Sequence, residues 1–274
     1  MKFQSIGVGP TAKLSLRVSV ATLCRVILPR PTDEARMLAL EHKATVFADG
    51  GDIQVLVKAQ PFGGAIRIMD DVRLFTRMDG FNFDSERSRA EGDFRIFIQP
   101  VKWEALREYC LQLDDNEVEP YLDVDPSREL VEEFEDALGI QLSPEQYNLK
   151  RLWTVVENEA APTENVRAHG NLTARIYYVS EIQVTDPTIC RLMINNSERY
   201  PAQVLRVMAL EDAQRYGSGR ANAMLITPFD KLNEVVRTVS PEKRGLPLDY
   251  EGTILDGNVI AILEELSVPK YDFY

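Results

Sequence analysis

Apolar and polar residues alternate along the first part of the chain, as they do in β-strands with one buried face. The alternation predicts one or two strands over residues 14–28 and two more over 44–48 and 53–59. Gly50-Gly51-Asp52 separates the last two of these segments and predicts a hairpin turn. We therefore expect a β-hairpin early in the chain.

Helical periodicity follows Thr32, which can begin a helix over residues 33–43, and it recurs over 102–112, 126–138 and 258–266. Further strands are expected at 94–98, 149–157, 173–182 and 201–205, an exposed loop at 79–93, and a helical turn at 211–216 that ends at Gly217. This mixture of strands and helices predicts a layered α/β or α+β domain.

The charge balance narrows the classes of ligand. The 274-residue chain carries 43 acidic and 31 basic residues, a formal charge of -12, which argues against a broad nucleic-acid-binding surface. Nucleotides are not excluded, because a bound metal can supply positive charge locally to a phosphate. No apolar run approaches the length of a membrane span, so we expect no membrane association and a cytoplasmic protein.

Cysteine and histidine are too sparse for most soft-metal sites. Cys24, Cys110 and Cys190 stand far apart, and we expect them to be buried small hydrophobes in a reducing compartment. Because His42 and His169 are the only histidines, a histidine-rich zinc site is excluded. Any metal site must then be built mainly from oxygen ligands.

The segment 126–138 has the best-marked helix boundaries in the chain. Asp125 is a good N-cap, Pro126 suits the first helical position, and Gly139 suits the left-handed position just after the end. At about 100° per residue, apolar residues and carboxylates separate onto two faces. The apolar face holds Leu130, Phe134, Ala137 and Leu138, and the carboxylate ridge holds Glu129, Glu132, Glu133 and Asp136.

Two interpretations of this ridge are open. Like charges at such spacings destabilise a helix by roughly 0.2–0.5 kcal/mol per pair unless something neutralises them, and converging oxygen ligands suit Mg²⁺ or Mn²⁺. A solvated acidic face explains the same spacing equally well. Under the second interpretation the protein is an interaction protein whose helix is only a soluble surface.

The stretch Arg128-Glu129-Leu130-x-Glu132-Glu133 resembles the R-E-U-x-E-E core of the Nudix box, where U is a bulky aliphatic residue. In that family the three glutamates bind the catalytic divalent cations and the arginine orients a glutamate. The resemblance therefore implies that Glu129, Glu132 and Glu133 bind Mg²⁺ or Mn²⁺. It also implies that Glu129 is the general base and that Arg128 orients it.

The resemblance implies a fold and a domain organisation as well. Gly63-Gly64 is similar to the glycine pair that many family members carry before the box, so both glycines are expected in the substrate site. A Nudix-like α/β/α sandwich with a mixed sheet would occupy residues 44–235, with an insertion at about 69–124. Residues 1–43 would be an N-terminal strand and helix extension, and 236–274 a C-terminal helical extension. We expect the insertion to carry substrate selectivity, as a lid or a dimer contact.

The implied function is divalent-metal-dependent hydrolysis of a phosphate anhydride in a nucleoside-diphosphate-linked substrate, by a homodimer. The family pattern has a glycine two residues after the second glutamate of its E-E pair, where this chain has Glu135 and a helix about one turn longer. That departure favours an alternative, a catalytically inactive Nudix-like module that binds a nucleotide-type small molecule or has a regulatory role.

Outside the box, one arginine and three carboxylates are candidates for the site. Arg175 alternates with apolar residues on a predicted strand and could bind phosphate, although a paired strand arginine is the commoner role. An acidic residue beyond the box could also serve as the base, for which Glu181, Asp186 and Glu198 are candidates. A plain surface charge is the alternative for each of them.

Overall fold

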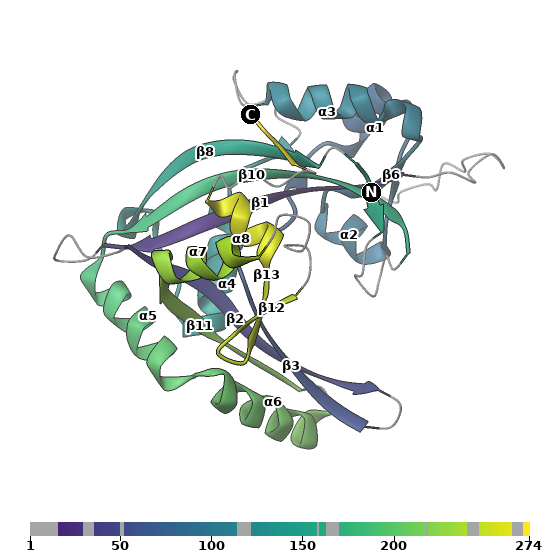
Figure 1. The fold of residues 1–274 in the computed structure, drawn as a ribbon. Helices are drawn as coiled ribbons and strands as arrows, with labels where there is room; N and C mark the ends of the chain where they lie inside the picture. Colours follow the sequence, from purple (N-terminus) through teal and green to yellow (C-terminus); the bar gives the residue numbers. More distant parts are fainter. Residues whose placement is uncertain are drawn as a thin grey trace.

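The computed structural model describes residues 16–29, 36–49, 52–113, 122–157, 159–162, 170–217, 219–239, 247–264 and 271–274. These residues form one 12-stranded mixed sheet with helices on both faces, and a separate two-stranded sheet (Figure 1). The strands of the large sheet are β1 (Leu16–Leu28), β2 (Met37–Asp49), β3 (Asp52–Gln60), β5 (Asn82–Phe83), β6 (Arg95–Ile98), β8 (Tyr147–Glu157), β9 (Ala161–Pro162), β10 (Leu172–Val184), β11 (Arg220–Pro228), β12 (Pro247–Tyr250), β13 (Thr253–Asp256) and β14 (Tyr271–Phe273).

Strand β1 is the centre of the large sheet. It pairs parallel with β10, from Arg17 opposite Thr173 to Ile27 opposite Gln183, and antiparallel with β2. Most of its residues are buried, as expected for a strand covered on both faces. The order across the sheet is β12-β13-β3-β2-β1-β10-β8-β14, and β11 pairs with β2.

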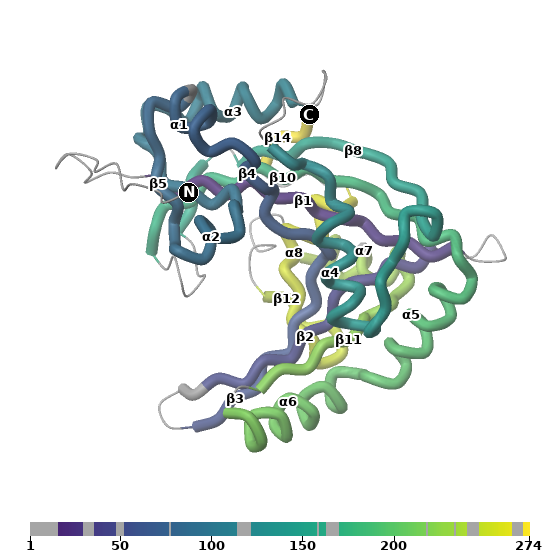
Figure 2. The backbone as a smooth tube through the Cα atoms, turned by 180° about the vertical axis from the view of Figure 1, so that it is seen from behind, coloured from purple at the N-terminus to yellow at the C-terminus, as the bar shows by residue number. Residues whose placement is uncertain are grey.

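Helices cover the two faces of the sheet (Figures 1 and 2). Adjacent residues of β1 point to opposite sides: Cys24 packs in a cluster with α4 and α5, whereas Leu23 packs in a cluster with α7 and α8. The helix α6 packs through Ala202 and Leu205 against β2, β3 and β11. The bounds are α4 (Ser127–Leu138), α5 (Pro187–Arg199), α6 (Ala202–Tyr216), α7 (Phe229–Thr238) and α8 (Gly257–Leu263).

The predicted insertion is built into the same sheet. Its strand β6 pairs antiparallel with the first part of β1, from Leu16 opposite Ile98 to Ser19 opposite Arg95. Its helices gather at one end of the molecule (Figure 2), where those over residues 71–78 and 103–112 share a hydrophobic core with β1 and β10. The remaining elements are α1 (Asp71–Met78), α2 (Glu86–Glu91), α3 (Trp103–Gln112), the 3₁₀ turns η1 (Pro100–Lys102) and η2 (Pro144–Gln146), and the small sheet of β4 (Arg67–Ile68) with β7 (Leu122–Asp123).

Several sequence predictions are confirmed. The chain is an α/β protein with a mixed sheet. The early hairpin is present, with Asp49 paired to Asp52 across its turn, and the predicted helices at α3, α4 and α8 are all formed. None of the described helices is both long enough and apolar enough to cross a bilayer.

Three predictions are wrong. The expected helix over 33–43 overlaps β2, because pairing with β1, β3 and β11 on its two sides overrides the helix preference of its residues. The expected loop over 79–93 contains α2, whose first turn is capped by the Ser85 side chain. The expected strand over 201–205 is the start of α6, with Pro201 at its N-cap.

The predicted terminal extensions also join the large sheet. Residues 1–43 contain β1 and the start of β2, which lie in the middle of the strand order. Residues 236–274 contain β12 and β13 at one edge and β14 at the other, together with α8. Along the described chain, both predicted extensions and the insertion therefore contribute strands to one sheet.

Candidate active site

Helix α4 projects its carboxylates from a well-anchored backbone. The N-cap is Pro126, one residue after the predicted Asp125, whose Oδ1 accepts a hydrogen bond from the Ser127 N–H at 2.8 Å. Gly139 ends the helix in the left-handed conformation with φ 69°. Leu130 and Phe134 are fully buried, and the Phe134 ring lies 5.2 Å from that of Phe62. This packing fixes the rotation of the helix, so the glutamate ridge faces away from the core.

The predicted glycine pair lies directly against this ridge. The Gly63 N–H donates a hydrogen bond to Oε2 of Glu133 at 2.7 Å. A Cβ at Gly64 would lie 2.6 Å from Cδ of Glu129, so only glycine leaves room for that side chain. The segment is held on β1, where the Thr22 N–H donates to the Gly64 carbonyl at 2.8 Å. Residues separated by more than sixty positions are thus brought together.

Arg128 holds two of the three predicted metal ligands. Its guanidinium lies 2.5 Å from Oε1 of Glu129 and 3.4 Å from Oε1 of Glu132, and it also donates to the Ala65 carbonyl at 3.5 Å. One arginine therefore orients Glu129 and screens Glu132 at the same time.

The site concentrates negative charge in a poorly solvated place. Burial and the nearby carboxylate of Glu41 raise the pKa of Glu133 to about 9, while the Gly63 N–H acts in the opposite direction. Burial also raises the pKa of Glu129, and the neighbouring Glu132 adds to this while Arg128 opposes it. Carboxylates of this kind gain from a bound cation, which favours their ionised form.

Glu41 is a member of this cluster that sequence reasoning missed. Its side chain on β2 is fully buried, forms an ion pair with Lys43, and accepts a hydrogen bond from Nε2 of Gln60 at 2.8 Å. The sequence signal for it is a glutamate directly after the apolar residues 37–40. The helix predicted over 33–43 gives this glutamate no place in the site.

The donor set suits a hard divalent cation, but the side chains are not gathered around one point. In the described part of the chain, no three His, Cys, Asp or Glu side chains are arranged so as to hold a metal ion. Glu129 and Glu132 are turned to Arg128, and Glu133 is turned to the Gly63 N–H. Binding of Mg²⁺ or Mn²⁺ by these three residues therefore requires their side chains to turn toward a common point.

Comparisons with known proteins add no family to this geometry. No protein-family model, no curated protein and no solved structure matches the chain. The interpretation of the site therefore depends on its residues alone.

A charged pocket of about 450 Å³ opens beside α4. Its lining combines four arginines with four carboxylates, and all of the arginines except Arg128 come from β4, α2 and β6. The lining residues are Ala65, Arg67, Arg87, Ala90, Glu91, Asp93, Arg95, Arg128, Glu129 and Glu132. Two of the predicted metal ligands thus share a pocket of ligand size with residues of the insertion.

Arg175 lies elsewhere. Its guanidinium on β10 is 2.7 Å from Oε2 of Glu157, which is fully buried, and it does not line the charged pocket. This is the paired strand arginine of the alternative interpretation, and its contact with substrate stays a prediction.

The three carboxylates proposed outside the box are also away from that pocket. Glu181 pairs with Arg25 at 2.7 Å, Asp186 caps the start of α5, and Glu198 is exposed on α5. None of them lines the charged pocket, so Glu129 is the candidate base best supported by position.

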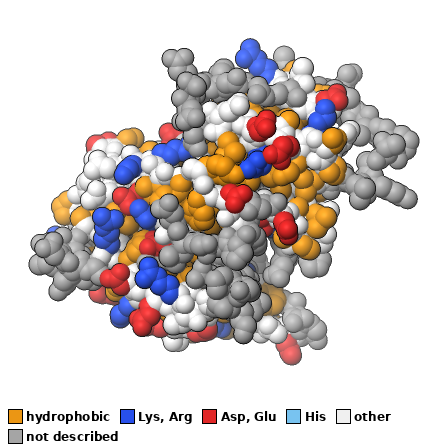
Figure 3. Space-filling view, turned by 45° about the horizontal axis from the view of Figure 1, so that its top comes forward, with side chains coloured by type: hydrophobic (Ala, Val, Ile, Leu, Met, Phe, Trp, Pro, Cys, Tyr) orange, Lys and Arg blue, Asp and Glu red, His pale blue; other side chains and the backbone are white. Residues whose placement is uncertain are grey.

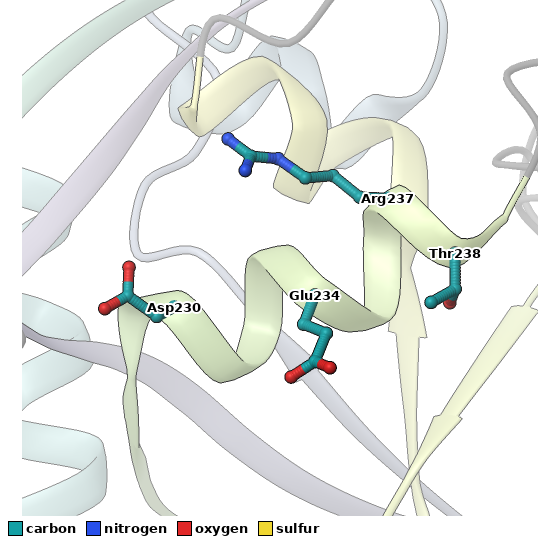
Figure 4. A pocket seen from close by; sticks show the side chains of 4 residues that line it. All are labelled: Asp230, Glu234, Arg237 and Thr238. Carbon is teal, nitrogen blue, oxygen red and sulfur yellow. The ribbon is translucent and has the colours of Figure 1, made fainter.

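Two other surface features carry less chemistry. A cavity of about 320 Å³ is lined on α7 by Asp230, Glu234, Arg237 and Thr238, whose side chains point in different directions and share no focus (Figure 4). On the face shown in Figure 3, the coloured acidic and basic side chains are interspersed among hydrophobic ones. That face presents no broad basic area among the described residues, in keeping with the charge balance of the chain.

Proposed function

We propose that the protein is a Nudix-type hydrolase that uses Mg²⁺ or Mn²⁺ to cleave a phosphate anhydride in a nucleoside-diphosphate-linked substrate. The observation that carries the proposal is the hydrogen bond from the Gly63 N–H to Glu133. The two sequence features that resemble the family are the glycine pair and the glutamates of α4. They are far apart along the chain, yet they lie in contact. The helices on both faces of a mixed sheet are compatible with the sandwich that the resemblance implies.

The residues have distinct roles in this mechanism. Glu129, Glu132 and Glu133 would hold the cation, and Arg128 would position Glu129. A divalent cation bound there neutralises phosphate oxygens and lowers the pKa of water. Glu129 takes the proton of the attacking water, whose oxygen bonds to phosphorus as the bridging P–O bond breaks.

The test is a panel of nucleotide sugars, dinucleotides and nucleoside triphosphates with Mg²⁺ or Mn²⁺, read as phosphate released after phosphatase coupling. We expect Glu132→Gln and Glu133→Gln each to lower turnover by about a hundredfold or more while the fold is kept. Glu135→Gln is the matched control, since Glu135 is exposed on the same helix and outside the cluster. Turnover close to wild type in both test variants would exclude the mechanism.

One observation favours a second function, a Nudix-like module that binds nucleotides without cleaving them. Glu129 and Glu132 are both paired with Arg128, and Glu135 occupies the position of the family glycine. Calorimetric binding of a nucleotide with no product after long incubation would support this function. Metal-dependent release of phosphate or nucleoside monophosphate would rule it out. A homodimer and a cytoplasmic location stay predictions, of which light scattering tests the first.

A further inference from the structure

The charged pocket has two parts with different charge. The part formed by α4 contributes Arg128, Glu129 and Glu132, which leaves one excess negative charge. The part formed by the insertion and β4 has three arginines but only two carboxylates, which leaves one excess positive charge. A cation at α4 would make both parts attractive to anions.

The three arginines of the second part retain most of their hydrogen-bonding capacity. Arg87 uses Nε for Glu91 at 2.6 Å, and Arg95 uses one terminal nitrogen for Asp93 at 2.7 Å. Among the described residues, Arg67 has no ion-pair partner. A guanidinium has five N–H donors, so all three arginines can still bind phosphate oxygens.

The backbone that carries these arginines is firmly held. The Ile68 N–H donates to the Gly92 carbonyl at 2.7 Å, and the Phe94 N–H donates to the Ile66 carbonyl at 2.8 Å. A Cβ at Gly92 would lie 3.3 Å from Cγ of Arg67, so the glycine leaves space for that side chain along the pocket. The guanidinium groups therefore project from fixed positions.

We infer that Arg67, Arg87 and Arg95 bind a phosphate group of the substrate additional to the diphosphate that is cleaved. The inference rests on the proposed function for the identity of the ligand as a substrate. The glutamates that would hold the cation lie on α4, whereas the three arginines lie on β4, α2 and β6 in the other part of the pocket. The arginines are then free for a further phosphate, to which a planar guanidinium binds in a bidentate manner.

The additional phosphate has two chemical sources. It is either the end of a longer polyphosphate chain or a phosphomonoester on the sugar or nucleoside. Three nucleotides separate these sources: a nucleoside diphosphate sugar with neither group, a nucleoside triphosphate, and a nucleoside diphosphate sugar with a phosphomonoester. We expect the wild-type protein to have a higher kcat/KM for one of the last two, and the preferred one identifies the source.

The variant that tests the site is Arg67→Gln, with Arg73→Gln as its matched control. Arg73 lies on the following helix α1, its side chain is 65% exposed, and it does not line the pocket. Arg67→Gln should lower kcat/KM for the preferred phosphorylated substrate by about tenfold and leave that for the plain nucleotide sugar unchanged. Equal kinetics in the two variants, with equal melting temperatures, would overturn the inference.

A binding measurement without metal separates this inference from the proposed function. Tripolyphosphate is titrated calorimetrically into the protein in the presence of a chelator, and we expect Arg67→Gln to weaken binding about tenfold relative to Arg73→Gln. If that loss is seen and the wild type cleaves no nucleotide, the anion site stands and the hydrolase fails. If the wild type cleaves nucleotides and Arg67→Gln leaves the affinity for tripolyphosphate unchanged, the anion site is refuted and the hydrolase proposal stands.

Discussion

The backbone N–H of Gly63 and the carboxylate of Glu133 are joined by a 2.7 Å hydrogen bond across seventy positions of the chain. All of the predicted insertion lies between them in sequence, and none of it comes between them in space. The glycine turn and helix α4 thus form one unit, whose stability should change when either partner is mutated.

The two glycines of the pair should respond differently to alanine. Gly63 has φ +126°, and a Cβ there would overlap the carbonyl oxygen of Thr22, so Gly63→Ala should destabilise the fold by about 2–4 kcal/mol. Gly64 has an ordinary φ, and its Cβ would overlap only the end of the Glu129 side chain. Gly64→Ala should keep the stability within about 1 kcal/mol while lowering turnover at least tenfold. Urea unfolding and steady-state kinetics of both variants check this contrast, and equal loss of stability in the two would contradict it.

Glu133→Gln should stabilise the protein in the absence of metal. The pKa of Glu133 is raised to about 9, so the stability linked to its proton is complete below pH 4.5 and is lost as the pH rises toward 9. Glutamine keeps an acceptor for the Gly63 N–H and cannot ionise, so the unfolded chain no longer gains free energy by releasing a proton from this residue. We expect a gain of at least about 1 kcal/mol at pH 8 and little change at pH 4.5. Thermal melts with a chelator at both pH values measure it, and a loss of stability at pH 8 would refute a raised pKa for this carboxyl.

His42 should make the fold sensitive to mild acid. Burial lowers its pKa to about 4, and Nε2 lies 3.0 Å from Oγ1 of Thr253 on β13. The unfolded chain takes up a proton near pH 6.5 and the folded chain does not, so stability falls between about pH 6.5 and pH 4. The slope from this group is at most about 1.4 kcal/mol per pH unit. Unfolding free energies at pH 7 and pH 5 should differ less in His42→Gln than in the wild type, and an identical difference would count against this role.

Asp84 should be essential for attaching the insertion to the sheet. It accepts hydrogen bonds from Nε and a terminal nitrogen of Arg17 at 2.9 and 2.7 Å, and both side chains are 7% exposed. Although burial opposes it, hydrogen bonds from Ser88 and Arg17 hold the pKa of Asp84 below its ordinary value.

Asp84→Asn leaves the Arg17 charge buried without its partner, which should cost about 3 kcal/mol. The exposed pair of Arg73 and Asp70 is the control, and Asp70→Asn should change the free energy of unfolding by less than about 1 kcal/mol. Similar losses in the two variants would show that the buried pair has no special role.

The sequence predicted helix α4 well because its signals are local. Gly139 adopts φ 69°, and the apolar residues Leu130 and Phe134 are fully buried, as the helical period requires. The first part of the strand β2, residues 37–43, could not be predicted in this way, although residues 44–48 were correctly predicted as strand. Leu38, Leu40 and Glu41 also suit a helix, and only pairing with three other strands decides their conformation.

The grouping of three arginines on one side of the charged pocket could not be predicted from the sequence, for a different reason. Arg67, Arg87 and Arg95 belong to three elements and have no shared period. Only the pairing of β4 with β7, and of β6 with β1, places them beside Arg128. Helix α2 itself had a readable signal in Ser85 and Gly92, its N-cap and C-cap, which the polar composition of the segment concealed.

Because β6 shares its hydrogen bonds with β1, the backbone that carries Arg95 cannot move away from the candidate site without breaking pairs of the central sheet. A ligand that binds at this protein would therefore meet a preformed surface on this side of the pocket. The protein would then select between ligands by shape and charge in the initial encounter. It would not need a slow conformational change after binding.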